Sequence, residues 1–172
     1  MKWMIASDLH GSYYYAQQLQ QAFEREQADR LLFLGDLLYH GPRNDLPRDY
    51  APKKVIPLLN SLAPKLLCVR GNCDAYSRSD AEENLLFNAD GVRIFMTHGH
   101  RYNVKLGYES LANAAHFSGA QLALFGHTHE ALETYDDGLY ILNPGSCSGF
   151  RATCGLVDIS PAGILTNILH IN

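Results

Sequence analysis

Short runs of apolar residues alternate along the chain with longer segments in which apolar residues recur at helical spacing. Several of the short runs are apolar almost throughout, which is typical of strands covered on both faces of a sheet. The strands expected from this pattern are residues 2–7, 30–34, 65–69, 92–97, 121–125, 133–136, 139–142, 155–159 and 164–170. Helices are expected over residues 12–27, 51–62 and 105–116.

The order of these elements predicts the class of fold. The chain begins β-α-β-α-β, as in a parallel sheet covered by helices, and ends in strands joined by tight turns, with a hairpin expected at Asp137 and Gly138. We therefore expect an α/β protein with two packed sheets, in one domain over residues 1–172, since neither a linker nor a repeat divides the chain. Two irregular stretches, residues 38–50 and 75–84, are long enough to build a site or a lid.

Charge and composition narrow the range of functions. The formal net charge of −4 and the pI near 6.0 provide no basic footprint, so stable binding to nucleic acid is not expected. No run of about 18 apolar residues occurs, and the first residues are typical of a strand rather than a signal peptide. We therefore expect a cytoplasmic protein without a membrane partner. The four cysteines contain no C-x2-C pair and are expected to be reduced and mostly buried.

Polar residues that can bind metal follow five of the expected strands, in the motifs SDLHGS, GDLLYHG, GNCD, THGH and GHTH. Residues two apart in an extended chain point the same way, so the aspartate and histidine of the first motif can converge on one point. The two histidines of the last motif can converge in the same manner. The candidate metal ligands are Asp8, His10, Asp36, Asn72, His98, His127 and His129.

Seven ligands are too many for one ion but suit two, provided that one carboxylate bridges them. Asp36 is the natural bridge, because a carboxylate has two oxygens and its strand is expected near the centre of the sheet. Mixed oxygen and nitrogen ligation without thiolate favours Mn²⁺, Fe, Zn²⁺ or Co²⁺ over Ca²⁺ or Mg²⁺. Each metal would keep positions open for water and substrate.

The motifs D-x-H, G-D, G-N-x-[D/E], H-G-H and G-H-T-H, in this order between Asp8 and His129, resemble the calcineurin-like metallophosphoesterase superfamily. N-P-G-S at residues 143–146 extends the resemblance, and HGPRNDLPRDYAPKKV and RGNCD are most similar to the YfcE-type bacterial phosphodiesterase branch. This resemblance implies two mixed β-sheets flanked by helices in a four-layer α/β/β/α sandwich. It also implies two divalent metal ions, with Mn²⁺ expected and Fe, Zn²⁺, Co²⁺ or Ni²⁺ as alternatives.

Matching motifs assign roles within this site. The first metal would be held by Asp8, His10, Asp36 and His129. The second would be held by Asp36, Asn72, His98 and His127. The residues expected to act in catalysis are Asp36, Asn72 and His100, with Asp74 supporting the loop around Asn72. The activity implied is hydrolysis of small phosphodiesters by in-line attack of a hydroxide that bridges the two metals.

Cys73 departs from the pattern, because many relatives have a histidine at this position. A thiol with a pKa near 8.5 is a poor acid for an alkoxide and carries no positive charge. Protonation of the leaving group could then fall to His100, to His40 or to no residue. Arg43 is either a phosphate contact or a solvated loop residue.

Alternative functions stay open. A phosphomonoesterase on the same two metals is the closest rival, and a non-catalytic protein-binding scaffold with this fold belongs to a different class. The acidic balance disfavours a nuclease, and a homo-oligomer is left open. We expect small substrates, because the chain is too short to add a sizeable specificity domain to the core.

Overall fold

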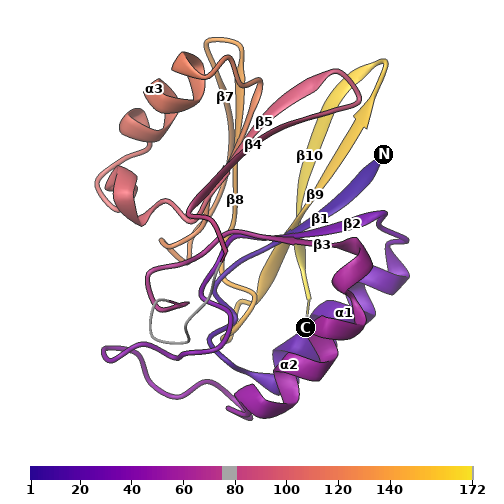
Figure 1. The fold of residues 1–172 in the computed structure, drawn as a ribbon, viewed down its shortest axis with the longest axis vertical. Helices are drawn as coiled ribbons and strands as arrows, with labels where there is room; N and C mark the ends of the chain where they lie inside the picture. Colours follow the sequence, from indigo (N-terminus) through magenta and orange to yellow (C-terminus); the bar gives the residue numbers. More distant parts are fainter. Residues whose placement is uncertain (75–80, 172) are drawn as a thin grey trace.

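The computed structural model describes residues 1–74 and 81–171, which form two stacked five-stranded sheets (Figure 1). The first sheet has the order β10-β9-β1-β2-β3. Its strands are β1 Lys2–Ala6, β2 Arg30–Phe33, β3 Leu66–Cys68, β9 Thr153–Ser160 and β10 Gly163–His170. The strands β1, β2 and β3 run parallel, whereas β9 pairs antiparallel with β1 and β10 pairs antiparallel with β9, so the sheet is mixed.

The second sheet has the order β4-β5-β6-β8-β7 and is also mixed. Its strands are β4 Asn84–Ala89, β5 Val92–Thr97, β6 Leu122–Leu124, β7 Ala131–Asp136 and β8 Leu139–Pro144. Here β5, β6 and β8 are parallel, and β4 and β7 pair as antiparallel edges. The hairpin expected at Asp137 and Gly138 joins β7 to β8, and both residues have positive φ.

Three α-helices cover the outer faces of the two sheets (Figure 1). Helices α1 (Tyr13–Arg25) and α2 (Pro52–Ser61) lie against the first sheet, and α3 (Glu109–Phe117) lies against the second. The expected four-layer α/β/β/α sandwich is therefore confirmed. None of the helices among the described residues is both long enough and apolar enough to cross a bilayer.

Side-chain alternation along the strands divides the core into layers. In β1, Met4 and Ala6 face the helices, whereas Trp3 and Ile5 face the other sheet. The layer between the sheets also contains Leu32, Leu34, Ile94, Met96, Leu122 and Leu124. Because both faces of the inner strands are buried, their sequences are nearly all apolar.

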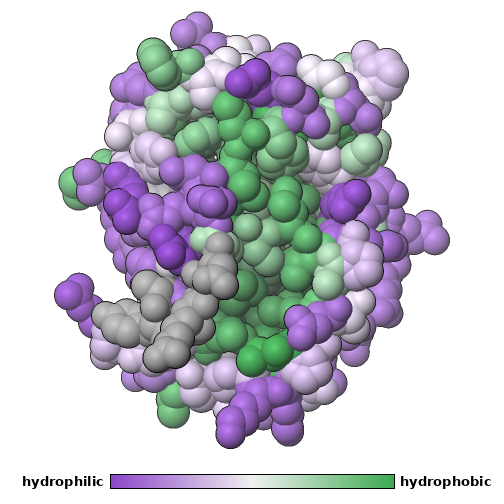
Figure 2. All heavy atoms as spheres, in the orientation of Figure 1, coloured by the Kyte–Doolittle hydropathy of each residue, from purple (hydrophilic) through white to green (hydrophobic). Residues whose placement is uncertain are grey.

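The apolar layer between the two sheets is partly open to solvent at one side of the molecule, beside the edge strands β3 and β4. A groove of about 340 Å³ is lined there by Trp3, Leu66, Leu67 and Phe87, among others. Figure 2 shows a broad apolar band on this face of the molecule.

The helix α1 follows its predicted course. The Ser12 hydroxyl accepts a hydrogen bond from the backbone N–H of Tyr15 at 3.2 Å, which caps the first turn. The buried stripe is the expected one: Tyr15, Ala16, Leu19, Ala22 and Phe23. The helix ends at Arg25, two residues before the expected end, because Gln27 has a left-handed backbone with φ 52°.

The other two helices differ in detail from the expectation. Helix α2 begins at Pro52, one residue after the expected start, and includes Pro57 on its exposed side without an interruption. Helix α3 begins at Glu109 instead of residue 105, because Gly107 with φ 145° cannot continue a helix. Lys105 therefore lies in the turn before the helix.

The sequence pattern missed strand β4 (Asn84–Ala89). It pairs with β5 in antiparallel register, from Asn84 opposite Thr97 to Ala89 opposite Val92. Asp90 and Gly91, with φ 49° and 82°, form the turn of this hairpin, and that Asp-Gly pair was the available signal. In the expected irregular stretch 75–84, residues 75–80 lie outside the described residues.

The layer between the sheets should dominate stability. Leu122 is completely buried there, so Leu122→Ala should lower the free energy of unfolding by about 2–5 kcal/mol through lost burial and an unfilled cavity. Leu165 on β10 is 71% exposed, so Leu165→Ala should change it by less than about 0.5 kcal/mol. Urea unfolding of both variants measures the difference; equal losses would contradict this assignment of the core.

Candidate dinuclear metal site

The expected ligands come from loops at the carboxyl ends of strands in both sheets. Backbone hydrogen bonds hold the loops of the first sheet together: the Asp8 N–H donates to the Gly35 carbonyl at 3.1 Å, and the His10 N–H to the Asp36 carbonyl at 2.9 Å. Across the sheets, the His127 N–H donates to Asp8 Oδ2 at 3.1 Å. The site therefore lies where the two sheets meet.

The backbone at this junction adopts an uncommon conformation. Five of the seven expected ligands have left-handed φ: Asp8 (59°), His10 (52°), Asp36 (57°), His127 (70°) and His129 (63°). This region costs non-glycine residues about 1 kcal/mol or more each, and such residues cluster at functional sites. The concentration of left-handed residues at these positions marks the junction as a candidate site.

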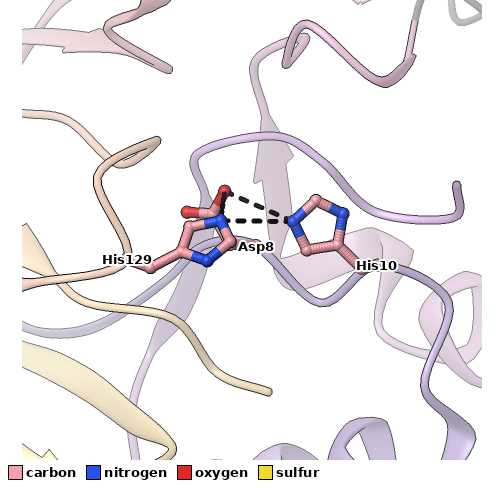
Figure 3. Close-up of side chains that lie close together, drawn as sticks. All are labelled: Asp8, His10 and His129. Carbon is pink, nitrogen blue, oxygen red and sulfur yellow. Dashed lines mark hydrogen bonds and ion pairs between the residues drawn. The ribbon is translucent and has the colours of Figure 1, made fainter. Parts of the chain in front are cut away.

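Three of the expected ligands converge in the first group (Figure 3). Asp8 Oδ1 lies 3.2 Å from His129 Nε2 and 3.7 Å from His10 Nε2. The two histidine nitrogens are 3.3 Å apart, and Figure 3 shows both rings turned toward the carboxylate. The ligand atoms of these residues all lie within 4.8 Å of one another, as a shared metal ion requires.

A second group forms around His98. Its Nε2 lies 3.0 Å from Asn72 Oδ1, 3.2 Å from His127 Nδ1 and 3.5 Å from Asp36 Oδ2. The Asn72 amide is oriented by its NH₂ group, which donates to Cys73 Sγ at 3.3 Å and turns the oxygen toward His98. The four side chains thus present oxygen and nitrogen atoms to one point.

Asp36 lies between the two groups. Its Oδ1 accepts the N–H of Cys73 at 2.8 Å, whereas Oδ2 lies 3.5 Å from His98 Nε2 and 3.9 Å from His10 Nε2. A single oxygen therefore faces both groups, which differs from a bridge that uses both oxygens.

The donor set fits divalent cations. The Nδ1 atoms of His10 and His98 lie 2.9 and 2.6 Å from the carbonyls of Tyr39 and Leu34, and since a carbonyl only accepts, both Nδ1 atoms carry the proton. Each Nε2 is then an acceptor turned toward carboxylate or amide oxygens. Acceptors that face one another are satisfied by a cation, and histidines fixed by a second hydrogen bond are typical metal ligands.

The same contacts perturb the pKa values. Burial favours a higher pKa for Asp8, but its contact with His129 and the nearby His98 outweigh burial and lower it. Burial raises the pKa of Asp36. Burial and the neighbouring His98 lower the pKa of His127 to about 4, which keeps this ring neutral and available as a ligand. The hydrogen bond with Asp8 raises the pKa of His129.

Asp74 organises the loops that carry Asp36 and Asn72. Its Oδ2 accepts the N–H groups of Asp36 at 2.7 Å and Gly71 at 2.8 Å, and its Oδ1 accepts the N–H of Leu37 at 2.9 Å. Gly71 is required by close approach, because a Cβ there would lie 2.1 Å from Asp36 Oδ1. The expected supporting role of Asp74 is confirmed by these bonds.

The N-P-G-S motif at residues 143–146 forms hydrogen bonds to the loops that carry Asp8, His127 and His129. The Asn143 NH₂ donates to the Gly126 carbonyl at 3.1 Å and to Thr128 Oγ1 at 2.9 Å. The Ser146 hydroxyl donates to the Asp8 carbonyl at 2.9 Å. The motif therefore positions the loops of Asp8 and of the two last histidines without contributing a ligand.

Cys73 lies closer to the site than the sequence indicated. It is buried, and its sulfur lies within 4.8 Å of ligand atoms of His10 and Asp36. Burial, with Asp36 beside it, raises the pKa of the thiol to about 12, so it stays protonated at neutral pH. A protonated thiol is a poor nucleophile.

The two histidines considered as acids lie behind the ligands. The ring of His100 packs 5.4 Å from that of His98 and 6.1 Å from that of His127, and burial lowers its pKa. The ring of His40 packs against Tyr39 and Tyr50. Neither lines the three cavities that border the ligands, so a role for His100 would act through the rings it touches.

Sequence analysis missed Lys105, Asn44 and Thr128. A cavity of about 150 Å³ at the ligands is lined by all three, and an adjoining cavity of about 520 Å³ by Lys105, Asn44 and Arg43. Lys105 was assigned to a helix, although it follows His98 by only seven residues. The short distance in sequence from a ligand was the one signal for it.

Comparison with known proteins identifies the family of the chain. A family model described as the calcineurin-like phosphoesterase superfamily domain matches residues 1–160. Phosphodiesterase YfcE of Escherichia coli (strain K12) is 36% identical over 92% of this chain and 88% of its own length. The probable metallophosphoesterase YsnB of Bacillus subtilis (strain 168) is 31% identical over 85% of this chain and 75% of its own length.

Solved structures show the same fold. The E. coli phosphoesterase Yfce superposes with a TM-score of 0.77 over 100% of both chains, at 31% identity. Vps29 of Entamoeba histolytica in complex with Zn²⁺ superposes with a TM-score of 0.72 over 100% of both chains, at 20% identity, and shows a likeness of fold alone. On the family match and the identity to YfcE, the chain belongs to the calcineurin-like phosphoesterase superfamily and is a metallophosphoesterase homologous to YfcE.

Proposed function

We propose that this protein is a metal-dependent phosphodiesterase that hydrolyses small phosphodiesters at the junction of its two sheets. The observation that carries the proposal is the set of oxygen and nitrogen atoms of Asp8, Asp36 and Asn72 and of four histidines, which gather at two adjoining points. The phosphodiesterase names of YfcE and of MJ0936 from Methanocaldococcus jannaschii, 25% identical, support the substrate class.

The proposed ligand sets follow the two groups. Asp8, His10 and His129 would hold one divalent cation, and Asn72, His98 and His127 the other, with Oδ2 of Asp36 shared. Such cations would supply the Lewis acid that activates a water and offsets the charge of the phosphodiester. We propose Mn²⁺ as the metal, a cytoplasmic location, and one domain over residues 1–172, since both sheets contribute ligands.

The chain's own side chains would set the charge of the site. Two carboxylates, Asp8 and Asp36, would offset half the charge of two divalent cations. The remainder matches a phosphodiester monoanion together with a deprotonated attacking water. Asp74 and the carbonyls of Leu34 and Tyr39 would hold the ligands in place, so little reorganisation is needed when charge develops.

Activity should depend on metal and favour diesters. Protein purified without chelator and supplied with Mn²⁺ should hydrolyse bis-p-nitrophenyl phosphate faster than p-nitrophenyl phosphate. A chelator should reduce the rate to background, and Mn²⁺ should restore it. Cleavage of the monoester alone would favour the phosphomonoesterase instead. Protein that binds no metal and stays inactive with Mn²⁺ would favour the scaffold.

Asp36→Asn should abolish turnover and lower the metal content, because one shared oxygen contributes to both groups. Metal content by mass spectrometry should fall well below about two ions per chain. The matched control is Asp137→Asn, the same change at an exposed hairpin residue that also has positive φ. Near wild-type activity and metal content in Asp36→Asn would exclude the shared role.

Cys73→Ser should retain most of the activity and all of the metal. With its pKa raised to about 12, the thiol is a poor nucleophile and too weak an acid to protonate a leaving group efficiently, so its loss should remove neither function. General acids contribute about 10²–10⁴-fold, so a loss below about tenfold in kcat fits this role. A thousandfold loss, or loss of metal, would show that the sulfur takes part in the chemistry or in ligation.

A further inference from the structure

A second cavity adjoins the metal ligands. It measures about 540 Å³, within the usual range for small-molecule sites, and its walls are mixed: Val104, Tyr108, Phe125 and Leu132 line it together with Lys105, Thr128 and Glu130. Its lining differs from that of the cavity beside Gly41, which contains Lys105 and Arg43 and no carboxylate.

Two residues connect this cavity to the metal ligands. Thr128 stands between His127 and His129 in sequence and lines both the 540 Å³ cavity and the small cavity at the ligands. Lys105 lines both cavities as well. A substrate with its phosphoryl group at the ligands therefore has the larger cavity within reach, past Lys105.

Lys105 is placed by the turn that follows the His98 motif. Gly99 (φ 101°) and Asn103 (φ 52°) turn the chain, and Val104 is buried against Gly99 and Phe125. With Val104 anchored, the next side chain is exposed at the cleft. Among residues 1–74 and 81–171, no hydrogen bond or ion pair engages the Lys105 ammonium, so it is available to a ligand.

The charges of the cavity indicate what it accepts. Glu130 is the one carboxylate among its lining residues, and it would repel an anionic group. The ammonium of Lys105 lies at the boundary with the metal ligands and attracts the phosphoryl group. An uncharged group with both apolar and polar parts fits this mixed lining, and the negatively charged phosphoryl group fits the boundary beside Lys105.

We propose that this cavity binds one uncharged ester arm of the substrate, an aryl or nucleoside group, while Lys105 holds an oxygen of the phosphoryl group. This inference rests on the proposed phosphodiesterase function and names its substrate class. Lys105 contributes the positive charge that the thiol of Cys73 lacks. Both residues line the small cavity at the ligands and the adjoining cavity beside Arg43.

The test compares two substrates with the same leaving group and different second arms. Methyl p-nitrophenyl phosphate has a small arm, and thymidine 5′-p-nitrophenyl phosphate has a nucleoside arm. The wild type should show the higher kcat/KM for the nucleoside ester. Leu132→Ala should lower this kcat/KM about tenfold through KM, and leave the methyl ester nearly unchanged, because only apolar contact is lost. Leu132→Trp, which narrows the cavity, should have the same selective effect.

Lys105→Ala should lower kcat/KM for both esters alike, by about ten- to a hundredfold, since the ammonium binds the group that they share. Lys105→Arg should recover part of the loss, and metal content should stay unchanged. The controls are Leu165→Ala on β10 and Lys53→Ala on α2, both exposed residues that line none of these cavities. An equal loss for both esters in both Leu132 variants would overturn the assignment of the cavity.

A binding measurement separates this inference from the proposed function. Calorimetry on the metal-loaded protein should show that thymidine 5′-monophosphate binds more tightly than methyl phosphate, and that Leu132→Ala removes the difference. This result without turnover of either ester would retain the subsite and reject the phosphodiesterase. Equal binding of the two monophosphates by the wild type would overturn the subsite, whatever the activity.

Discussion

The Asp36 carboxylate is held at the point where the two sheets meet, and the rest of the site depends on how it is held. Its Oδ1 is occupied by the Cys73 N–H, and its own N–H is bound by Asp74, so Oδ2 alone faces His10 on one side and His98 on the other. Because that oxygen has no freedom to turn away, ligands from opposite sheets are brought into one cluster. The close approach of Gly71 is part of the same constraint, since any Cβ there would displace the carboxylate.

The strained backbone of the ligands is supported by the packing behind it. Five ligands adopt left-handed φ, which is unfavourable without compensation. Directly behind them, strands such as β1, β2 and β6 are buried on both faces, and the network of Asp74, Asn143 and Ser146 bonds the loops to each other. The core thus stabilises a site whose backbone conformation is locally unfavourable.

The position of Cys73 changes the electrostatics of the cleft relative to relatives with histidine there. A buried, protonated thiol contributes no charge. The ring of His40 packs against Tyr50 and the ring of His100 against His98, and neither ring lines the cavities at the ligands. Lys105, in the turn between β5 and α3, is a cation that lines the small cavity at the ligands. Vps29 has the same sandwich fold at only 20% identity, so the fold by itself does not indicate a function. The functional argument therefore rests on the residues of the cleft.

Sequence alone determined the types of element, the two packed sheets and the seven candidate ligands. These follow from local properties: alternation along strands, helical spacing in α1, and polar residues at strand ends. Strand β4 was not predicted, because Asn84–Ala89 has no distinctive hydrophobic period before its Asp-Gly turn. Lys105 was not predicted to line the cleft, because it was assigned to a helix, whereas Gly107 makes α3 begin only at Glu109. Tertiary structure alone decided that one oxygen of Asp36 serves both groups, that the thiol of Cys73 is buried beside it, and that Lys105 borders the cleft. Each of these depends on segments distant in sequence packing against one another, and no local pattern encodes such contacts.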